Sequence, residues 1–410
     1  MQFKKACLLI LTILFISCSG TQTAQIWTDS AEFALYGEYF NSVQNQYKVT
    51  VRYFDLPAAE MEISGKTPDI VVGRWLKSTS MRVNFNSLNN LFRKKRLSSD
   101  NFYPRILDIG RYERNQLFLP VSFNIPALIF SKSRGKEISN SFTIDFNEVK
   151  TLSRNFNVIN RSAYTHMGFS PLWNDNFLFT AAVLSGASFR EAHPLAWDAV
   201  ALDRSMDFIF NWTHEINTGN QVEEDFTFKY FFEPPERLIQ SERIFFSYIE
   251  SRDLFTLSED SKNLLDFRWI MEQNRVPINE DMIFLGIPKK AKSKSAARAF
   301  ILWFFQVESQ RLLMEYSRSK RLSENVFGIC GGFSALIPVT EQIFPRFYPE
   351  LLGRMPPSEN FMSPNILPGN WAAIKERVIL PYLNDRARSQ NADNIYSLER
   401  RLSDWMRINI

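Results

Sequence analysis

The stretch IWTDSAEFALYGEYFNSVQNQYKVTVRYF, residues 26–54, decides the fold class of this chain. It begins with a short apolar strand, after which Phe33, Tyr36 and Phe40 recur at the spacing of one helix face. The segment KVTVRYF, residues 48–54, then alternates apolar and polar side chains, as a strand with one buried face does. A strand, a helix and a second strand in this order are typical of an α/β domain.

Further strands and helices follow along the chain. PDIVVG, residues 68–73, is a short apolar run that ends in glycine, which is typical of a strand buried on both faces of a parallel sheet. LFLPVSFNIPALIFSK, residues 117–132, is extended chain interrupted by two prolines, which indicates a crossing between two bodies. MIFLGIPKKAKSKSAARAFILWFF, residues 282–305, predicts a strand, a loop and a helix. The remaining expected elements are helices over 175–186 and 195–217, a strand over 242–251 and a helix from Ser397 onward.

The composition is that of an ordinary globular protein. The 410 residues are 45% hydrophobic and 22% charged, and this length suggests two or three domain-sized units. The formal net charge of +4 is too slight to indicate a nucleic-acid partner. Cys330 is the only cysteine after the first 18 residues, so no internal disulfide is expected. Three histidines and one cysteine in the body of the chain do not indicate a zinc site of nitrogen and sulfur ligands, and we expect neither a metal nor another cofactor.

The N-terminus reads as an export signal. LLILTILFISCSG, residues 8–20, follows Lys4 and Lys5, and its apolar part is shorter than the ~20 apolar residues that cross a bilayer. A basic start, an apolar middle and small residues before a cleavage point form a secretory signal. We therefore expect residues 1–17 to be removed on export.

The expected cleavage point lies directly before Cys18. The segment resembles the lipobox of bacterial lipoproteins, with Phe15 where leucine is usual. The resemblance implies that lipid on Cys18 anchors the exported chain to a membrane, facing the periplasm, and that residues 18–23 form a tether. The alternative is a plain signal peptide that is cut nearby.

Four motifs extend the pattern of the opening stretch in a fixed order. They are TPDIVVG at 67–73, LPVSFNIPALIFSK at 119–132, the strand and long helix of 283–316, and GICGGFSALIPV at 328–339. Together with the opening stretch they resemble the bacterial extracellular solute-binding proteins of ABC importers, in particular the sugar-binding lipoproteins of family 1. Thr67 stands where that family usually has glycine.

The resemblance implies an α/β, two-lobed, periplasmic-binding-protein-like fold of type II, with a hinge and a ligand cleft between the lobes. We expect an N-lobe of residues 24–122 plus 286–332 and a C-lobe of residues 123–285 plus 333–410. Open parallel sheets also bind ligands beyond the carboxyl ends of their strands, which independently favours such a cleft. The implied role is capture of a small polar solute, in the first place a sugar or oligosaccharide, by a monomer that delivers it to an ABC permease.

Ligand contacts are expected just after strands. In the N-lobe the candidates are Thr28, Asp29, Ser30, Gly73, Arg74 and Trp75. Short polar groups suit hydroxyls, glycine allows close approach, and Arg74 and Trp75 offer a hydrogen-bond fork and a stacking face. Two alternatives stay open, because Asp29 with Glu32 also fits a helix capping box and Trp75 also fits a packing role.

Other candidates lie at the predicted crossing and in the C-lobe. They are Ser122, Asn124, Trp173, Asn174, Asp175, Tyr248, Glu250 and Trp371. Trp173 is flanked by an amide and an acid, and a pyranose site uses such a ring for the C–H face and polar groups for the hydroxyls. The amide of Asn124 suits sugar hydroxyls because it both donates and accepts, or else it satisfies backbone groups at the hinge.

Enzymatic sites find little support in the sequence. The three histidines lack metal-ligand spacing, and GGFSAL, residues 331–336, lacks the final glycine of a nucleophile elbow. We therefore expect binding without chemistry on the ligand. One alternative is a different ligand, namely a polyamine, an oligopeptide or an anion held by Arg74. The other is a different function, namely a surface-exposed lipoprotein that holds a host or cell-wall component without transport.

Overall fold

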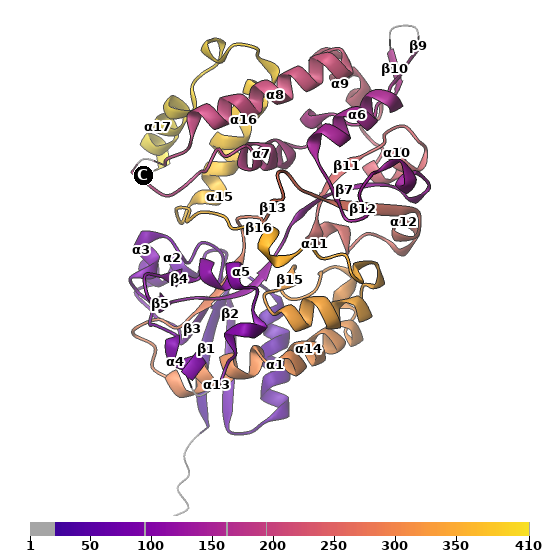
Figure 1. Ribbon diagram of the computed structural model, residues 1–410. Helices are drawn as coiled ribbons and strands as arrows, with labels where there is room; N and C mark the ends of the chain where they lie inside the picture. The colour runs from indigo at the N-terminus through magenta and orange to yellow at the C-terminus, as the bar shows by residue number, and fades with distance from the viewer. Residues whose placement is uncertain (1–20, 94–95, 161–162, 194, 410) are drawn as a thin grey trace, which may run out of the picture.

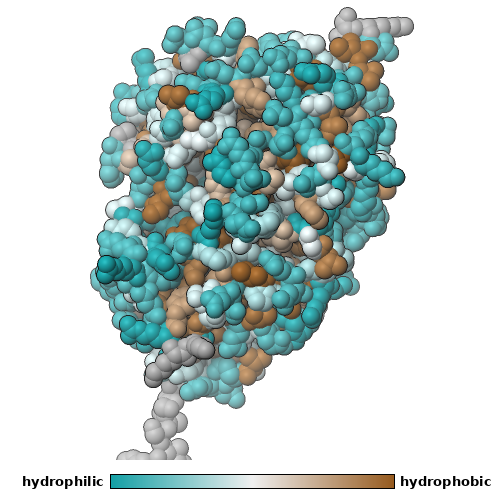
Figure 2. Space-filling model, in the orientation of Figure 1, coloured by the Kyte–Doolittle hydropathy of each residue, from teal (hydrophilic) through white to brown (hydrophobic). Residues whose placement is uncertain are grey.

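The chain folds into two lobes, one above the other in Figure 1. The computed structural model describes residues 21–93, 96–160, 163–193 and 195–409, so the predicted signal and Cys18 lie outside the described residues. Among the helices in these ranges, none is long and apolar enough to cross a membrane. The face seen in Figure 2 is mainly hydrophilic, with apolar residues exposed in small groups.

The N-lobe, lower in Figure 1, is built on a six-stranded sheet with the order β15, β6, β14, β3, β1, β2. Its strands are β1 (Gln22–Thr28), β2 (Tyr47–Tyr53), β3 (Ile70–Gly73), β6 (Leu119–Phe123), β14 (Ile283–Gly286) and β15 (Phe333–Ser334). Strand β1 pairs in parallel with β2 and β3, whereas β14 runs antiparallel to β3 and β6. The helices are α1 (Glu32–Val43), α2 (Pro57–Ser64), α3 (Thr79–Arg82), α4 (Asn89–Phe92), α5 (Pro104–Ile109), α13 (Lys294–Phe304) and α14 (Val307–Ser319). A small hairpin of β4 (Arg111–Tyr112) and β5 (Asn115–Gln116) completes the lobe.

The opening stretch folds as predicted, into strand, helix and strand. Phe33 and Phe40 are buried in α1, with ring centroids 5.5 Å from Phe304 and 5.3 Å from Phe300 of α13. Such aromatic pairs hold the two helices together. The predicted capping box is wrong, because the N-cap of α1 is Ala31 and no side chain caps the helix. Strand β1 also begins at Gln22, within the predicted tether.

The C-lobe, upper in Figure 1, surrounds a four-stranded sheet with the order β11, β7, β12, β8. Its strands are β7 (Pro126–Ser131), β8 (Thr143–Ile144), β11 (Ser247–Glu250) and β12 (Leu265–Ile270), with a separate hairpin of β9 (Val158–Asn160) and β10 (Ala163–His166). Its helices are α6 (Phe146–Phe156), α7 (Asp175–Leu184), α8 (Ala199–Asn217), α9 (Asn220–Lys229), α10 (Pro235–Gln240), α11 (Ser251–Leu254), α12 (Glu259–Leu264), α15 (Trp371–Ile374), α16 (Leu380–Arg388) and α17 (Leu398–Asn409). The helices predicted over 175–186, over 195–217 and at the C-terminus are confirmed, while only the last part of the predicted strand over 242–251 is a strand.

Side chains of β7 alternate between two cores. Leu128 and Phe130 pack in the core of the C-lobe helices, whereas Ala127 and Ile129 belong to the core that continues into the N-lobe. The alternation is the period of two that a strand imposes. This one strand therefore joins the packing of the two lobes.

Three crossings connect the lobes. The chain passes from β6 to β7 at residues 124–125, as the two prolines predicted, and returns between β12 and β14 through β13 (Val276–Pro277). It crosses last through β16 (Phe361–Met362), which pairs with β13 in parallel. The predicted lobe boundaries differ from this arrangement, because β14 and β15 both belong to the N-lobe sheet. Both strands pair with β6, and this pairing is a long-range contact that a short apolar run does not reveal.

Asn124 ties the first crossing to both lobes and to the second crossing. Its Nδ2 donates to the Gly331 carbonyl at 2.9 Å, and its Oδ1 accepts from the Ser251 hydroxyl at 2.6 Å. Its backbone carbonyl accepts from the Asn279 N–H at 2.9 Å. The predicted alternative, in which Asn124 satisfies groups at the hinge, is therefore confirmed.

Replacing Asn124 is expected to weaken the joint between the lobes. Asn124→Ala removes both side-chain hydrogen bonds, which leaves the buried Ser251 hydroxyl without its acceptor and the Gly331 carbonyl without its donor, so the free energy of unfolding should fall by roughly 2–4 kcal/mol. Urea denaturation measures the difference. Asn365→Ala is the matched control, because its side chain also makes two hydrogen bonds but is exposed and contacts one lobe. Equal losses in the two variants would contradict the role of Asn124.

Candidate functional site

Two adjoining cavities lie between the lobes. The central cavity, of about 400 Å³, is lined by Trp75, Asn174, Glu250 and Lys375 among others. The hinge cavity, of about 210 Å³, reaches Asp29, Ser122 and Asn124. Arg74, Arg252, Asp253 and Asp281 line both cavities, so we treat the two together as the interlobe cleft.

Three strand ends bring the N-lobe groups to the cleft. Asp29 follows β1, and Arg74 follows β3, the parallel neighbour of β1. Asp281 precedes β14, and because β14 is antiparallel to β3, its beginning lies at the same sheet edge. The site therefore sits beyond the carboxyl ends of the parallel strands.

Asp29 is held in place by its neighbours, yet one of its oxygens has no partner. Its side chain is 7% exposed, and Oδ2 accepts the Arg74 backbone N–H at 3.1 Å and lies 3.8 Å from Arg74 Nε. Oδ1 is buried and accepts no hydrogen bond from the described residues. Burial raises the pKa of Asp29, against the lowering effect of Arg74. A Cβ at position 73 would lie 3.2 Å from Oδ1 and 2.9 Å from Pro57 Cγ, so Gly73 allows this close approach.

Arg252 joins the acids of the two lobes. Its Nε lies 3.0 Å from Glu250 Oε2 at the end of β11, and its Nη2 donates to Asp281 Oδ2 at 2.5 Å. Burial raises the pKa of Glu250 to about 7, although Arg252 acts to lower it. Burial also acts to raise the pKa of Asp281, but the adjacent guanidinium outweighs this effect and holds that pKa below its usual range. Asp281 is therefore the ionised partner of Arg252, whereas Glu250 takes up a proton more readily.

Glu280 forms a second charged group in the central cavity. It accepts from Lys375 Nζ at 2.7 Å and from Trp371 Nε1 at 3.3 Å. The indole of Trp371 is buried against the stacked rings of Phe179 and Phe189. Trp371 also lines the central cavity, where its N–H orients Glu280.

An indole and amides complete the central cavity. Trp75 is half-buried, lines the cavity from the N-lobe and packs against the C-lobe core. Asn174 caps α7, because its Oδ1 accepts the Asn176 N–H at 2.9 Å. Asn174, Asn176 and Asn279 all line the central cavity. These groups suit a ligand with one apolar face and several hydroxyls.

Of the remaining predicted contacts, three lie outside the cleft. Thr28 is fully buried, and its hydroxyl accepts the Ser30 N–H at 3.0 Å. Asp175 is exposed and accepts from Asn384 at 2.8 Å. Trp173 stacks on Phe226, with centroids 5.8 Å apart and planes at 19°, and lines neither cavity of the cleft. The predictions for these residues are corrected because tertiary partners occupy their side chains.

Three predicted residues line the cleft with their hydroxyl groups already engaged. Ser30 donates to Glu32 at 2.7 Å, and Ser122 donates to the Cys330 carbonyl at 3.4 Å. The phenol of Tyr248 lies 3.1 Å from the Thr180 hydroxyl. They shape the cleft, and their oxygens retain acceptor capacity.

Most charged groups of the cleft were not predicted from the sequence. Among them are Arg252, Glu280, Asp281 and Lys375, and the amide of Asn279 was also missed. The run NED, residues 279–281, directly precedes a predicted strand, and it would have been found had that strand been recognised as antiparallel. Arg252 lies two residues beyond Glu250, which was predicted.

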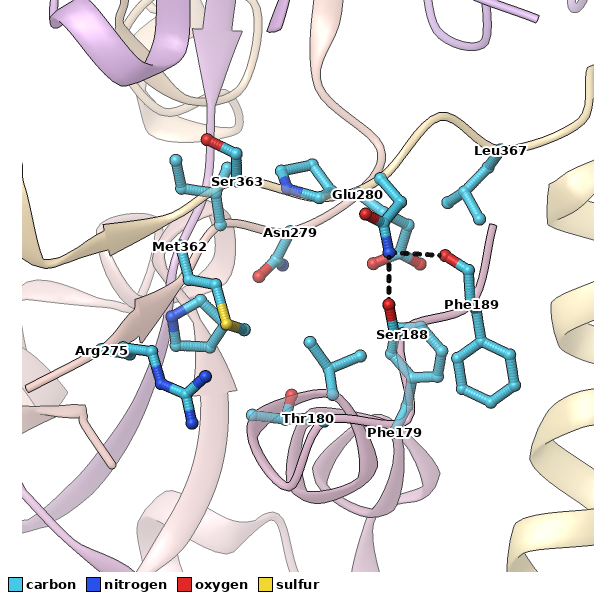
Figure 3. A pocket seen from close by; sticks show the side chains of 16 residues that line it. Phe179, Thr180, Ser188, Phe189, Arg275, Asn279, Glu280, Met362, Ser363 and Leu367 are labelled. Carbon is cyan, nitrogen blue, oxygen red and sulfur yellow. Dashed lines mark hydrogen bonds between the residues drawn. The ribbon is translucent and has the colours of Figure 1, made fainter. Parts of the chain in front are cut away.

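A further cavity of about 280 Å³ opens beside the central one and shares Asn279 and Glu280 with it. In Figure 3 the rings of Phe179 and Phe189 lie on one side of it and Arg275 on another. Asn365, also in its wall, donates to Ser188 Oγ at 3.2 Å and to the Phe189 carbonyl at 3.0 Å. This side cavity lengthens the space open to a ligand.

One contact spans the lobes near this region. Glu191 of the C-lobe accepts the Thr79 N–H at 2.9 Å and the Thr79 hydroxyl at 2.7 Å at the start of α3. The lobes are therefore in direct contact outside the hinge.

No family model and no curated protein sequence matches the chain. Solved structures do match over nearly its whole length. The ABC substrate-binding protein Lmo0181 from Listeria monocytogenes, in complex with cycloalternan, aligns with a TM-score of 0.63 and 13% identity over 94% of this chain and 97% of that one. The cyclic alpha-maltosyl-1,6-maltose binding protein from Arthrobacter globiformis aligns with a TM-score of 0.62 and 12% identity over 94% of this chain and 97% of that one. The sugar-binding protein MalE from Xanthomonas citri aligns with a TM-score of 0.63 and 12% identity over 94% of this chain and 96% of that one. The chain thus has the two-lobed α/β fold of these binding proteins.

Proposed function

We propose that this chain is the substrate-binding protein of an ABC importer and that it captures a sugar or oligosaccharide between its lobes. The observation that carries the proposal is the interlobe cleft, where amides, charged groups and the indole of Trp75 meet from both lobes. Sugar hydroxyls exchange hydrogen bonds with such groups, and the C–H face of a ring packs on an indole. Proteins with the same fold have been solved with cycloalternan and with mannotriose bound.

Capture works by lobe closure. A ligand that contacts both lobes stabilises the closed arrangement in proportion to the contacts that it makes only there. Arg74 and Trp75 contribute the N-lobe contacts, while Asn174 and Glu250 contribute those of the C-lobe. The ligand leaves unchanged, and the permease recognises the closed monomer.

A panel of mono- and oligosaccharides tests the proposal by thermal shift and calorimetry. One sugar class, at about 100 times its Kd, should raise the free energy of unfolding by ~2.7 kcal/mol. Trp75→Ala should weaken that binding about tenfold or more, because it removes the stacking face.

Trp173→Ala is the matched control for this experiment. It removes another half-buried indole from outside the cleft, so it should leave the affinity within about twofold of wild type while lowering stability. No response to any sugar, or equal loss of binding in the two variants, would contradict the proposal.

We also propose that the protein is exported and anchored in the cell envelope through lipid on Cys18, facing the periplasm. The support is the sequence of residues 8–20, which resembles a lipobox. Cells fed a labelled fatty acid should label the wild-type chain but not Cys18→Ser. Cys7→Ser, inside the expected signal, should keep the label. A labelled Cys18→Ser chain, or an unlabelled wild type, rules the anchor out.

A further inference from the structure

The interlobe cleft holds more acids than bases. Seven carboxylate side chains line the central and hinge cavities, against three cationic ones, namely Arg74, Arg252 and Lys375. The three cations are already paired with acids, as described above. Three further acids, Glu32, Asp253 and Glu376, form no ion pair among the described residues. Asp253 and Glu376 are exposed and solvated, whereas Glu32 is partly buried, so a cationic ligand would compensate negative charge mainly in the hinge cavity.

Asp29 is the second and more specific observation. Its side chain is more than nine-tenths buried, it lines the hinge cavity, and its Oδ1 accepts no hydrogen bond from the described residues. A buried carboxylate oxygen without a donor is costly, so a ligand that donates to it gains free energy. Arg74 faces the other oxygen, Oδ2, so Oδ1 is the oxygen of Asp29 without a donor, and a ligand in the hinge cavity reaches it through a small rotation of the carboxylate, which is packed against Gly73.

The same acids are not arranged as a metal site. Among the described residues, no group of three or more His, Cys, Asp or Glu side chains is placed to hold a metal ion. An ammonium group makes lesser demands, because its three donors can be shared between carboxylates and carbonyls. The asparagines and Trp75 in the adjoining central cavity remain suited to a sugar ring.

We propose that the sugar taken up by the interlobe cleft carries a protonated amine, as an amino sugar does, and that its ammonium group binds beside Asp29 in the hinge cavity. The inference rests on the proposed function and narrows its ligand class. The ring and its hydroxyls occupy the central cavity, while the ammonium compensates the excess of carboxylates.

Proton linkage is a consequence of this arrangement. Burial raises the pKa of Glu250 to about 7. The titratable and charged residues that line the central cavity with it come from five parts of the chain: Tyr248 on its own strand, Arg252 and Asp253 on α11, Glu280 and Asp281 before β14, Lys375 and Glu376 beyond α15, and Arg74 of the N-lobe. A cationic ligand favours the ionised carboxylate, so its affinity should rise between about pH 6 and pH 7, and it should fall again above about pH 8 as the amine of the ligand loses its own proton. A neutral sugar should show no such rise. Glu250→Gln should flatten the profile of the cationic ligand.

Matched pairs of sugars test the inference by calorimetry. Glucosamine, galactosamine and mannosamine are each compared with the neutral sugar of the same configuration, and the dimer of glucosamine is compared with cellobiose. In the pair that binds, the amine should bind about tenfold or more tightly, with an affinity that falls as salt is raised. A neutral partner that binds equally or better overturns the inference and leaves the proposed function standing. Binding of spermidine without any sugar, or no binding at all, overturns both.

Asp29→Asn locates the ammonium group. It keeps an oxygen for the Arg74 N–H but removes the charge, so the amine and the neutral sugar of the same configuration should bind with equal affinity. Asp175→Asn is the matched control, because Asp175 is exposed and lies outside the cleft. Should Asp29→Asn fail to fold, Glu32→Gln in the same cavity should reduce the preference severalfold. An unchanged preference in the folded variants overturns the assignment.

Discussion

The structure depends on one buried asparagine at the first crossing between the lobes. Asn124 bonds to Gly331, Ser251 and Asn279, which belong to three separate parts of the chain. Both side-chain amide groups are used, and a buried amide with satisfied partners fixes the geometry around it. The hinge is thereby tied at one point, and the cleft opens directly beside it, since Asn124 also lines the hinge cavity.

The cleft follows from the direction of the strands. Three parallel strands end at one edge of the N-lobe sheet, and the antiparallel β14 begins at that edge. Polar residues that flank these strands therefore gather in one place, although they come from positions as distant as Asp29 and Asp281. Burial raises the pKa of Asp29 and of Glu250. Arg74 offsets the rise at Asp29 only in part, and Arg252 offsets that at Glu250 only in part. The carboxylate charge that the cations of the cleft do not balance can attract a ligand of opposite charge. The charged residues of the cleft therefore affect which ligands it binds.

Much of the fold could be predicted from the sequence, and much of the site could not. Local patterns revealed α1, the strands of the opening stretch and the crossing at 124–125, because periodicity and prolines act within a few residues. Asp29, Arg74, Trp75 and Glu250 were also within reach, since each lies at a strand end. Trp173 misled the prediction, because only tertiary contacts show that it packs on Phe226 outside the cleft. Asp281 and Lys375 were missed since the direction of β14 and the docking of the last helices are long-range facts.

The central claim is that ligand is held between the lobes by groups of both. Hydrogen exchange of the whole chain, with and without the tightest-binding sugar, tests it most directly. Binding in the cleft should slow exchange together at residues 74–76 of the N-lobe, 251–254 of the C-lobe and 279–282 of the second crossing. Protection confined to one lobe, or to the outer surface around α17, would show that the ligand binds elsewhere and would contradict the account.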